Sequence, residues 1–186
     1  AGDLNLYYDV NHTNWYKRPD WFLVLGVPSA RQQEDLRWSY VVWQEGVNPF
    51  LVIELLSPGT EDEDLGHNLR EIQQPPGKWE VYERILRVPY YGVYDRYQNK
   101  FRLFSLMATK YQEIEIKQNR YWFSELELGL GVWEGEFQRS TGKWLRWYDQ
   151  SNNWIPTSAE LAQYEHQRAE TEKQRAERLA QRLRDL

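Results

Sequence analysis

Short segments rich in apolar and aromatic residues, each bounded by turn-forming residues, recur along most of the chain. Strands are predicted in the first half at residues 4–10, 21–27, 36–44 and 49–56. The last of these is apolar at nearly every position, which is typical of a strand covered on both faces. Residues 90–95, 100–107 and 111–116 alternate at period two and predict an antiparallel meander, and residues 133–137 and 143–148 predict a hairpin.

Two segments have the spacing of helices. Within residues 78–88 apolar residues recur three and four positions apart, and Pro89 follows, so this segment predicts one helix. Thr157 and Glu160 form a capping-box pattern before a stretch without glycine or proline, which predicts a helix to residue 186. Alanines recur seven residues apart in this helix, as in a coiled coil. Glutamates, however, occupy the second set of positions that a coiled coil would need to be apolar. We therefore expect a solvated or weakly pairing helix.

Composition bounds the class of protein. The 186 residues suit one domain with an appendage, and a hydrophobic fraction of 41% indicates a folded chain. The chain has no cysteine, which excludes disulfides, thiolate nucleophiles and cysteine-bound metals. A membrane-spanning helix needs roughly 20 apolar residues in a row, and no such run or secretory signal is found. We expect a cytoplasmic protein without a membrane partner.

The same patterns divide the chain into two parts. Residues 1–154 are predicted to form one domain, and residues 155–186 a separate C-terminal helix. The sequence opens inside a strand-like pattern, so we expect the N-terminal part of the domain to be incomplete.

Glu54 interrupts the most apolar predicted strand. Counting by twos, it shares a face with Val52 and Leu56, so a carboxylate lies on a surface that should be buried. Burying an unpaired charge costs several kcal/mol, as an order of magnitude, and is tolerated with a counter-charge, a proton or a metal. From the pattern alone, Glu54 fits a structural ion pair, a wet edge strand or a functional site.

Two further residues become candidates for a functional site when they are considered together with Glu54. Asp20 follows a proline at the start of a predicted strand, where it could cap a turn. Together with Glu54 it would supply the two carboxylates through which magnesium is often bound. Lys78 lies at the start of a predicted helix, a mildly unfavourable place for a cation, and is either a solvated lysine or a functional one.

Other candidate chemistry is weaker. The three histidines lack the spacing of metal ligands, and Ser57 lacks the context of a nucleophile. The acidic run at residues 61–64 is interpreted as a solvated loop, although it could bind a cation. The many tryptophans are interpreted as core residues.

Several of these residues together resemble a known family. Arg18-Pro19-Asp20 before a strand, VIELLSPGT around Glu54, an acid at Asp64, Lys78 with Tyr82 four residues on, and VPYYGVYD are similar to the Uma-two family of restriction-endonuclease-like proteins. This family is abundant in cyanobacteria and belongs to the PD-(D/E)XK superfamily. The resemblance covers roughly residues 3 to 150.

The resemblance implies an α/β (α+β) fold with a mixed β-sheet flanked by helices, and a magnesium-dependent endonuclease. Mg2+ or Mn2+ would be held by Asp20, Glu54 and the carbonyl of Leu55, with Asp20, Glu54 and Lys78 as the catalytic residues. The superfamily places a lysine two residues after the acid, where this chain has Leu56. Family members usually have only a few residues between the acid and the lysine, whereas residues 67–77 intervene here between Asp64 and Lys78. Arg70 is therefore the alternative residue for the cationic role.

The predicted substrate is DNA, and a homodimer would cut both strands. The net charge is -5, but residues 67–110 hold eight basic and four acidic residues. Binding should therefore be weak and salt-dependent. The alternative function is a catalytically inactive module that keeps the nuclease fold and binds a partner protein. A third reading, a sugar- or lipid-binding domain, would place the tryptophans in an open groove.

Overall fold

The computed structural model describes residues 1–57, 59, 61–66 and 74–184. By internal contacts the chain divides into two units, one of residues 1–121 and 130–145 and the other of residues 122–129 and 146–186. No helix of the described residues is long and apolar enough to cross a membrane.

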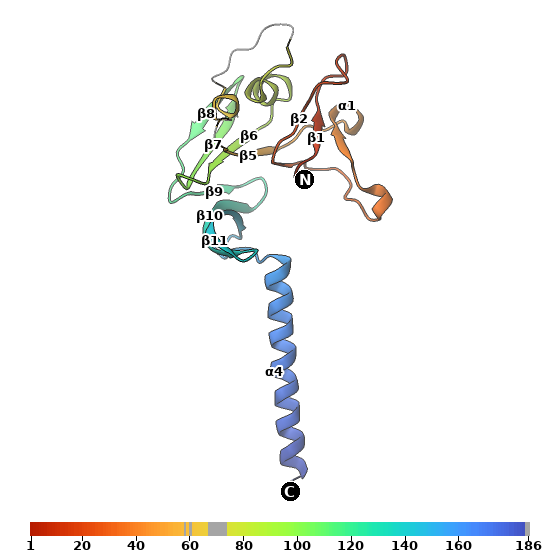
Figure 1. Cartoon of the computed structure of the whole chain (residues 1–186), viewed down its shortest axis with the longest axis vertical. Helices are drawn as coiled ribbons and strands as arrows, with labels where there is room; N and C mark the ends of the chain where they lie inside the picture. Colours follow the sequence, from red (N-terminus) through yellow and green to blue (C-terminus); the bar gives the residue numbers. More distant parts are fainter. Residues whose placement is uncertain (58, 60, 67–73, 185–186) are drawn as a thin grey trace. The chain divides into compact units, whose positions relative to one another are not determined.

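Strands dominate the first unit (Figure 1). In chain order the elements of the structure are β1 (Asn5–Tyr7), β2 (Tyr16–Lys17), β3 (Trp21–Leu23), η1 (Gln33–Asp35), β4 (Ser39–Val41), α1 (Val42–Glu45), β5 (Leu51–Leu55), α2 (Glu61–Asp64), α3 (Lys78–Glu80), η2 (Val81–Ile85), β6 (Tyr90–Asp95), β7 (Lys100–Met107), β8 (Lys110–Ile114), β9 (Arg120–Phe123), β10 (Leu128–Phe137), β11 (Ser140–Tyr148) and α4 (Ser158–Arg184).

The central sheet is mixed and has the order β3-β5-β6-β7-β8. β5 pairs in parallel with β6 and antiparallel with β3, and β6, β7 and β8 form the predicted antiparallel meander. Strands β2, β1 and β4 form a second sheet, and β11, β10 and β9 a third. This arrangement confirms the expected α+β class, with a mixed sheet, few helices and a C-terminal helix.

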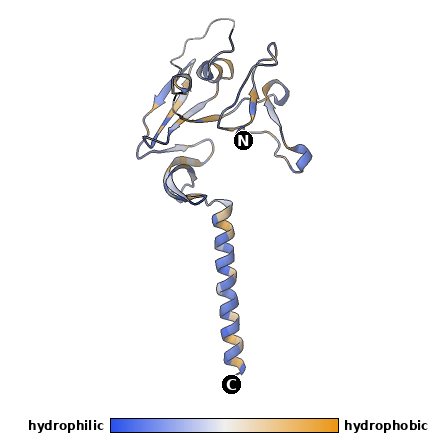
Figure 2. Cartoon of the chain, in the orientation of Figure 1, coloured by the Kyte–Doolittle hydropathy of each residue, from blue (hydrophilic) through white to orange (hydrophobic). Residues whose placement is uncertain are grey.

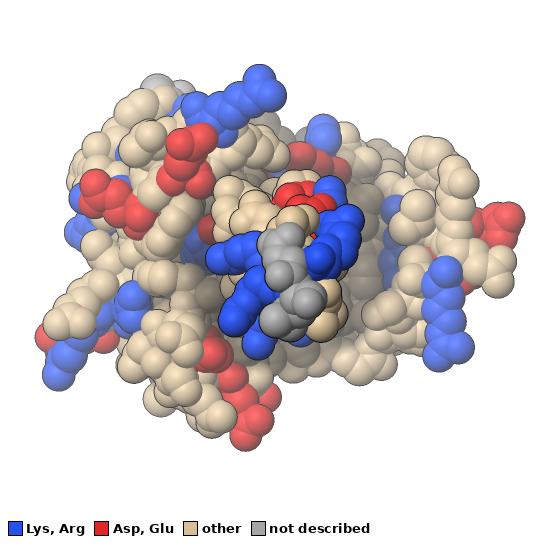
Figure 3. All heavy atoms as spheres, turned by 90° about the horizontal axis from the view of Figure 1, so that it is seen from below, with Lys and Arg blue, Asp and Glu red and all other residues tan. Residues whose placement is uncertain are grey.

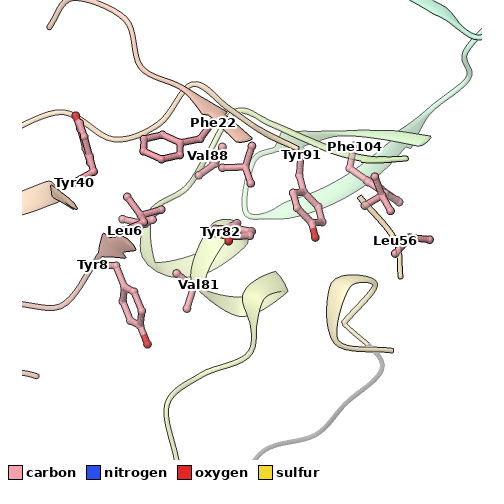
Figure 4. Packing of buried hydrophobic residues seen from close by; sticks show 13 residues of the cluster. Leu6, Tyr8, Phe22, Tyr40, Leu56, Val81, Tyr82, Val88, Tyr91 and Phe104 are labelled. Carbon is pink, nitrogen blue, oxygen red and sulfur yellow. The ribbon is translucent and has the colours of Figure 1, made fainter. Parts of the chain in front are cut away.

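One aromatic-rich core joins the central sheet to the β2-β1-β4 sheet and to the helical turns. Figure 4 shows Phe22 and Tyr91 along the strands, with Tyr82 on the helical turn facing them. Leu6 and Tyr40 extend this cluster from β1 and β4, and all five residues are buried. Burying a large apolar side chain contributes about 1.5–3 kcal/mol, so this cluster fixes how the turn at η2 sits on the sheet.

Three predictions of local structure were wrong. The predicted strand 36–44 stops at Val41, because Val42–Glu45 form a helical turn that Gly46 ends in the left-handed conformation, at φ 71°. The predicted helix 78–88 is two short pieces, since the Leu86 N–H donates to Val81 O at 2.8 Å, five residues back, in a π-turn. The acidic run 61–64, interpreted as a loop, forms α2.

In the second unit the ring of Tyr148 packs against Trp122 and Trp154, with centroids 5.9 and 5.7 Å away. Gly129 lies directly under this ring, because a Cβ there would come within 1.9 Å of Tyr148 Cζ. Gly129 is therefore within β10 and makes room for an aromatic ring.

Helix α4 begins at the predicted capping box. The Thr157 N–H donates to Glu160 Oε2 at 2.7 Å, and the Glu160 N–H donates to Thr157 Oγ1 at 3.2 Å. None of its described residues is buried, and Figure 2 shows that most of the helix is hydrophilic, with separate bands of hydrophobic residues. Basic side chains surround its C-terminal end in Figure 3, where Arg182 and Arg184 occupy the last turn and complement the helix dipole.

Candidate active site

Asp20 and Glu54 meet at the same end of two adjacent strands. Trp21 on β3 pairs with Ile53 on β5, so the residues next to this pair, Asp20 and Glu54, also lie side by side. The Asp20 N–H donates to Glu54 Oε2 at 3.4 Å, and the Leu55 N–H donates to Asp20 Oδ2 at 2.7 Å. The two carboxylates predicted from the sequence are thus held together by the backbone of the strands.

Lys78 reaches the same place from the start of α3. Its ammonium donates to Glu54 Oε2 at 3.0 Å and to Asp64 Oδ1 at 2.8 Å. Glu54 is 0% exposed and Asp64 1% exposed, so the lysine lies between two buried carboxylates. Asp20, Glu54, Asp64 and Lys78 form what we call the acid cluster.

Two buried tyrosines support the acid cluster. The Tyr82 hydroxyl donates to Glu54 Oε1 at 3.0 Å, and the Tyr91 hydroxyl donates to the carbonyl oxygen of Asp64 at 2.9 Å. Tyr82 follows Lys78 by four residues, so both side chains leave the same face of the helical segment and meet Glu54. Burial raises the pKa of both tyrosines well above the usual value, so each remains a neutral hydrogen-bond donor.

Burial and the neighbouring charges have opposite effects on the pKa values of Glu54 and Lys78. Burial raises the pKa of Glu54 to about 7, even though Lys78 favours the ionised carboxylate. For Lys78, burial alone would lower the pKa, but the carboxylates of Glu54 and Asp64 outweigh burial and hold the pKa above its usual value. Lys78 is therefore a permanent cation near neutral pH and cannot serve as a general base.

The oxygen atoms of Asp20, Glu54 and the adjoining backbone suit a hard divalent cation. Asp20, Glu54 and the Leu55 carbonyl offer only oxygen, which Mg2+ prefers over nitrogen or sulfur. Among the residues that the structure describes, no three His, Cys, Asp or Glu side chains are arranged to hold a metal ion. Mg2+ usually takes only one or two carboxylates from a protein and completes its octahedron with water and substrate phosphates.

The raised pKa of Glu54 predicts a stability trend with pH. The folded state favours the protonated acid, so stability is full below the ordinary value of 4.5 and is lost as pH rises through about 7. Glu54→Gln removes this loss. Between pH 5 and pH 8 its free energy of unfolding should therefore rise relative to wild type by up to about 3 kcal/mol.

Urea unfolding in EDTA measures this difference at both pH values. The matched control is Glu136→Gln, at an exposed position of β10, which should give no such trend. A pH-independent difference between Glu54→Gln and wild type would contradict the assignment of the raised pKa.

Sequence reasoning missed part of this site. Asp64 and Tyr82 were noticed only as parts of the family pattern, and Asp64 was assigned to a solvated loop. The spacing from Lys78 to Tyr82 was the signal that could have linked Tyr82 to Glu54. Arg70, the alternative to Lys78, lies outside the described residues.

A mixed sheet with helical segments beside it, with acids where β3 and β5 meet and a lysine from α3 reaching them, defines a restriction-endonuclease-like protein. The family model Uma2, described as "Putative restriction endonuclease", matches residues 1–139. The chain belongs to this family. No curated protein sequence matches the chain. Restriction-endonuclease-like proteins generally use divalent metals.

Proposed function

We propose that this chain is a magnesium-dependent endonuclease that hydrolyses phosphodiester bonds of DNA at the acid cluster. One observation carries the proposal: Lys78 lies within 3.0 Å of two buried carboxylates, with Asp20 beside them on the adjacent strand. A buried group of charges in this arrangement costs stability, and such sites are often retained for chemistry.

Asp20, Glu54 and the carbonyl of Leu55 would hold Mg2+, and Mn2+ could replace it. The ion would polarise the scissile phosphate and lower the pKa of a bound water. The hydrogen bond from the Leu55 N–H fixes Asp20, and the hydrogen bond from Tyr82 fixes Glu54. The chain's own contribution is therefore to orient two carboxylates before any ion binds.

Lys78 would act as a fixed positive charge. A cation held at this place can orient the attacking water and stabilise the charge that develops on the pentavalent phosphate. Because Glu54 and Asp64 keep its pKa high, Lys78 remains charged throughout the reaction. Asp64 would hold the lysine in position from the side opposite Glu54.

DNA as the substrate is supported by the uneven distribution of charge. Residues 67–110, which include Lys78, carry eight basic and four acidic residues, although the chain as a whole is at -5. Binding through so few cations should be weak and fall steeply with salt. Cleavage of both strands would call for two centres, and we propose a homodimer that acts in the cytoplasm.

A second candidate function is a module that keeps the nuclease fold and binds a partner without catalysis. It is favoured by the same lysine, whose ammonium already lies between the carboxylates of Glu54 and Asp64 and would compete with a metal ion. The two functions differ in whether a divalent ion reaches Asp20 and Glu54.

Cleavage of supercoiled plasmid tests the proposal. Wild type should nick the plasmid in Mg2+ and not in EDTA, and both Glu54→Gln and Lys78→Met should be much slower. Equal residual cleavage by all three proteins would mean that the acid cluster is not the catalytic centre and would favour the binding module.

A further inference from the structure

The register of the central sheet places two basic residues on the same face as Glu54. Glu54 on β5 pairs with Val93 on β6, and Val93 pairs with Arg102 on β7. Residues paired across neighbouring strands point to the same face, and so do residues two apart along one strand. Arg102 and Lys100 therefore share the face of the acid cluster, with Arg102 two strands, or about 10 Å, from Glu54.

A cavity opens beside these basic residues. Its lining residues are Leu56, Leu65, Val93, Asp95, Gln98, Lys100 and Arg102. Leu65 follows Asp64 directly, and Leu56 lies two residues after Glu54, so one wall of the cavity continues from the acid cluster. The volume is about 60 Å³, enough for a few water molecules. The cavity can therefore take the oxygens of one phosphate.

Arg102 is held in a fixed orientation at the edge of this cavity. Its Nε donates to Glu113 Oε1 at 2.8 Å and its Nη2 to Glu113 Oε2 at 2.7 Å. Its guanidinium carbon also lies 5.0 Å from the centroid of the Phe104 ring. The hydrogen bonds from Arg102 lower the pKa of Glu113 against the effect of burial, and Lys100 adds to this lowering. Lys100 is exposed and offers a second positive charge beside the fixed guanidinium.

We propose that Lys100 and Arg102, with the cavity that they line, bind a phosphate of the substrate strand about three nucleotides from the scissile one. This subsite rests on the proposed nuclease function and deepens it by naming where the flanking strand is held. A strand of B-DNA rises about 3.4 Å per phosphate. A separation of about 10 Å therefore corresponds to a phosphate about three nucleotides from the scissile bond. The contact carries no base preference, because it recognises only the phosphate.

Kinetics of duplex cleavage test this subsite. With a labelled DNA duplex in Mg2+, Lys100→Gln should raise KM about 3–10-fold and change kcat less than about 2-fold, since one charge contact to the strand is lost. The plot of log(1/KM) against log[salt] should also become shallower by about 0.9, the value for one phosphate contact. The matched control is Lys117→Gln, an exposed lysine outside the cavity lining, and it should behave as wild type.

Glu113→Gln is expected to change KM in the opposite direction from Lys100→Gln. Removing the negative charge paired with Arg102 leaves more of the guanidinium's positive charge to attract the phosphate, so KM should fall about 2-fold or more. A rise in KM would mean that the Arg102–Glu113 pair only supports the sheet, and would overturn the role of Arg102.

The outcomes separate the two proposals. If wild type cleaves the duplex but Lys100→Gln and Lys117→Gln have the same KM, the subsite is wrong and the nuclease assignment stands. If wild type does not cleave the duplex in Mg2+ or Mn2+, both proposals fail.

Discussion

Glu54→Gln is expected to lower magnesium-dependent plasmid cleavage by about 10³-fold or more while leaving the protein folded. A bound metal contributes several kcal/mol to stabilising the transition state, and each 1.36 kcal/mol corresponds to about tenfold in rate. Glutamine keeps an oxygen that can accept the Tyr82 hydrogen bond but removes the negative charge that would attract the ion. The rate is measured from the appearance of nicked plasmid.

The stability of the same variant makes this result specific. Because Glu54 is buried and its pKa is raised to about 7, the neutral glutamine should not destabilise the protein at pH 8. A loss of cleavage by a well-folded Glu54→Gln protein therefore reports on chemistry. Cleavage within about twofold of wild type would remove Glu54 from the catalytic site.

Lys78→Met is expected to lower the free energy of unfolding by about 3–5 kcal/mol at pH 8. This substitution removes the ammonium that Glu54 and Asp64 share and leaves two buried carboxylates facing each other. Breaking a buried ion pair by removing one partner typically costs this much. The loss should shrink at pH 5, where the carboxylate of Glu54 takes up a proton.

Two further variants check the cause of that loss. Lys143→Met removes the lysine of a more exposed pair, Lys143–Glu134 at 3.9 Å, and should cost less than about 1 kcal/mol. Adding Glu54→Gln to Lys78→Met should restore part of the stability, because only one uncompensated carboxylate remains. If Lys78→Met is as stable as wild type at pH 8, Lys78 does not form the buried ion pairs with Glu54 and Asp64 in solution.

The sequence predicted strands well where apolar and polar residues alternate along the chain, because this alternation determines which side chains are buried. The bounds of β6 and β7 agree with the predicted segments 90–95 and 100–107, since period-two patterning with the turn between them defines both. The turn at Val42–Glu45 was missed, because its apolar residues also suit a strand. Its end depends on the left-handed backbone of Gly46, which a local pattern does not specify.

The sequence predicted only part of the acid cluster, because only part of it has a local signal. Glu54 stood out because a carboxylate interrupted an apolar strand, and this signal is local. Asp64 lies in a run of four acids, whose composition suggests solvent exposure. Its burial depends on α2 lying against the sheet, where the Tyr91 hydroxyl donates to the Asp64 carbonyl. That contact joins residues 27 positions apart and has no signature in the sequence.

A crystal structure of the protein soaked in Mn2+ would show whether Asp20 and Glu54 hold a metal ion, because the anomalous signal locates the ion. We expect an anomalous peak bound by carboxylate oxygens of Asp20 and Glu54 and by the Leu55 carbonyl, with Lys78 adjacent. Lys78 still bonded to both Glu54 and Asp64, with no ion at Asp20 at millimolar Mn2+, would contradict this expectation.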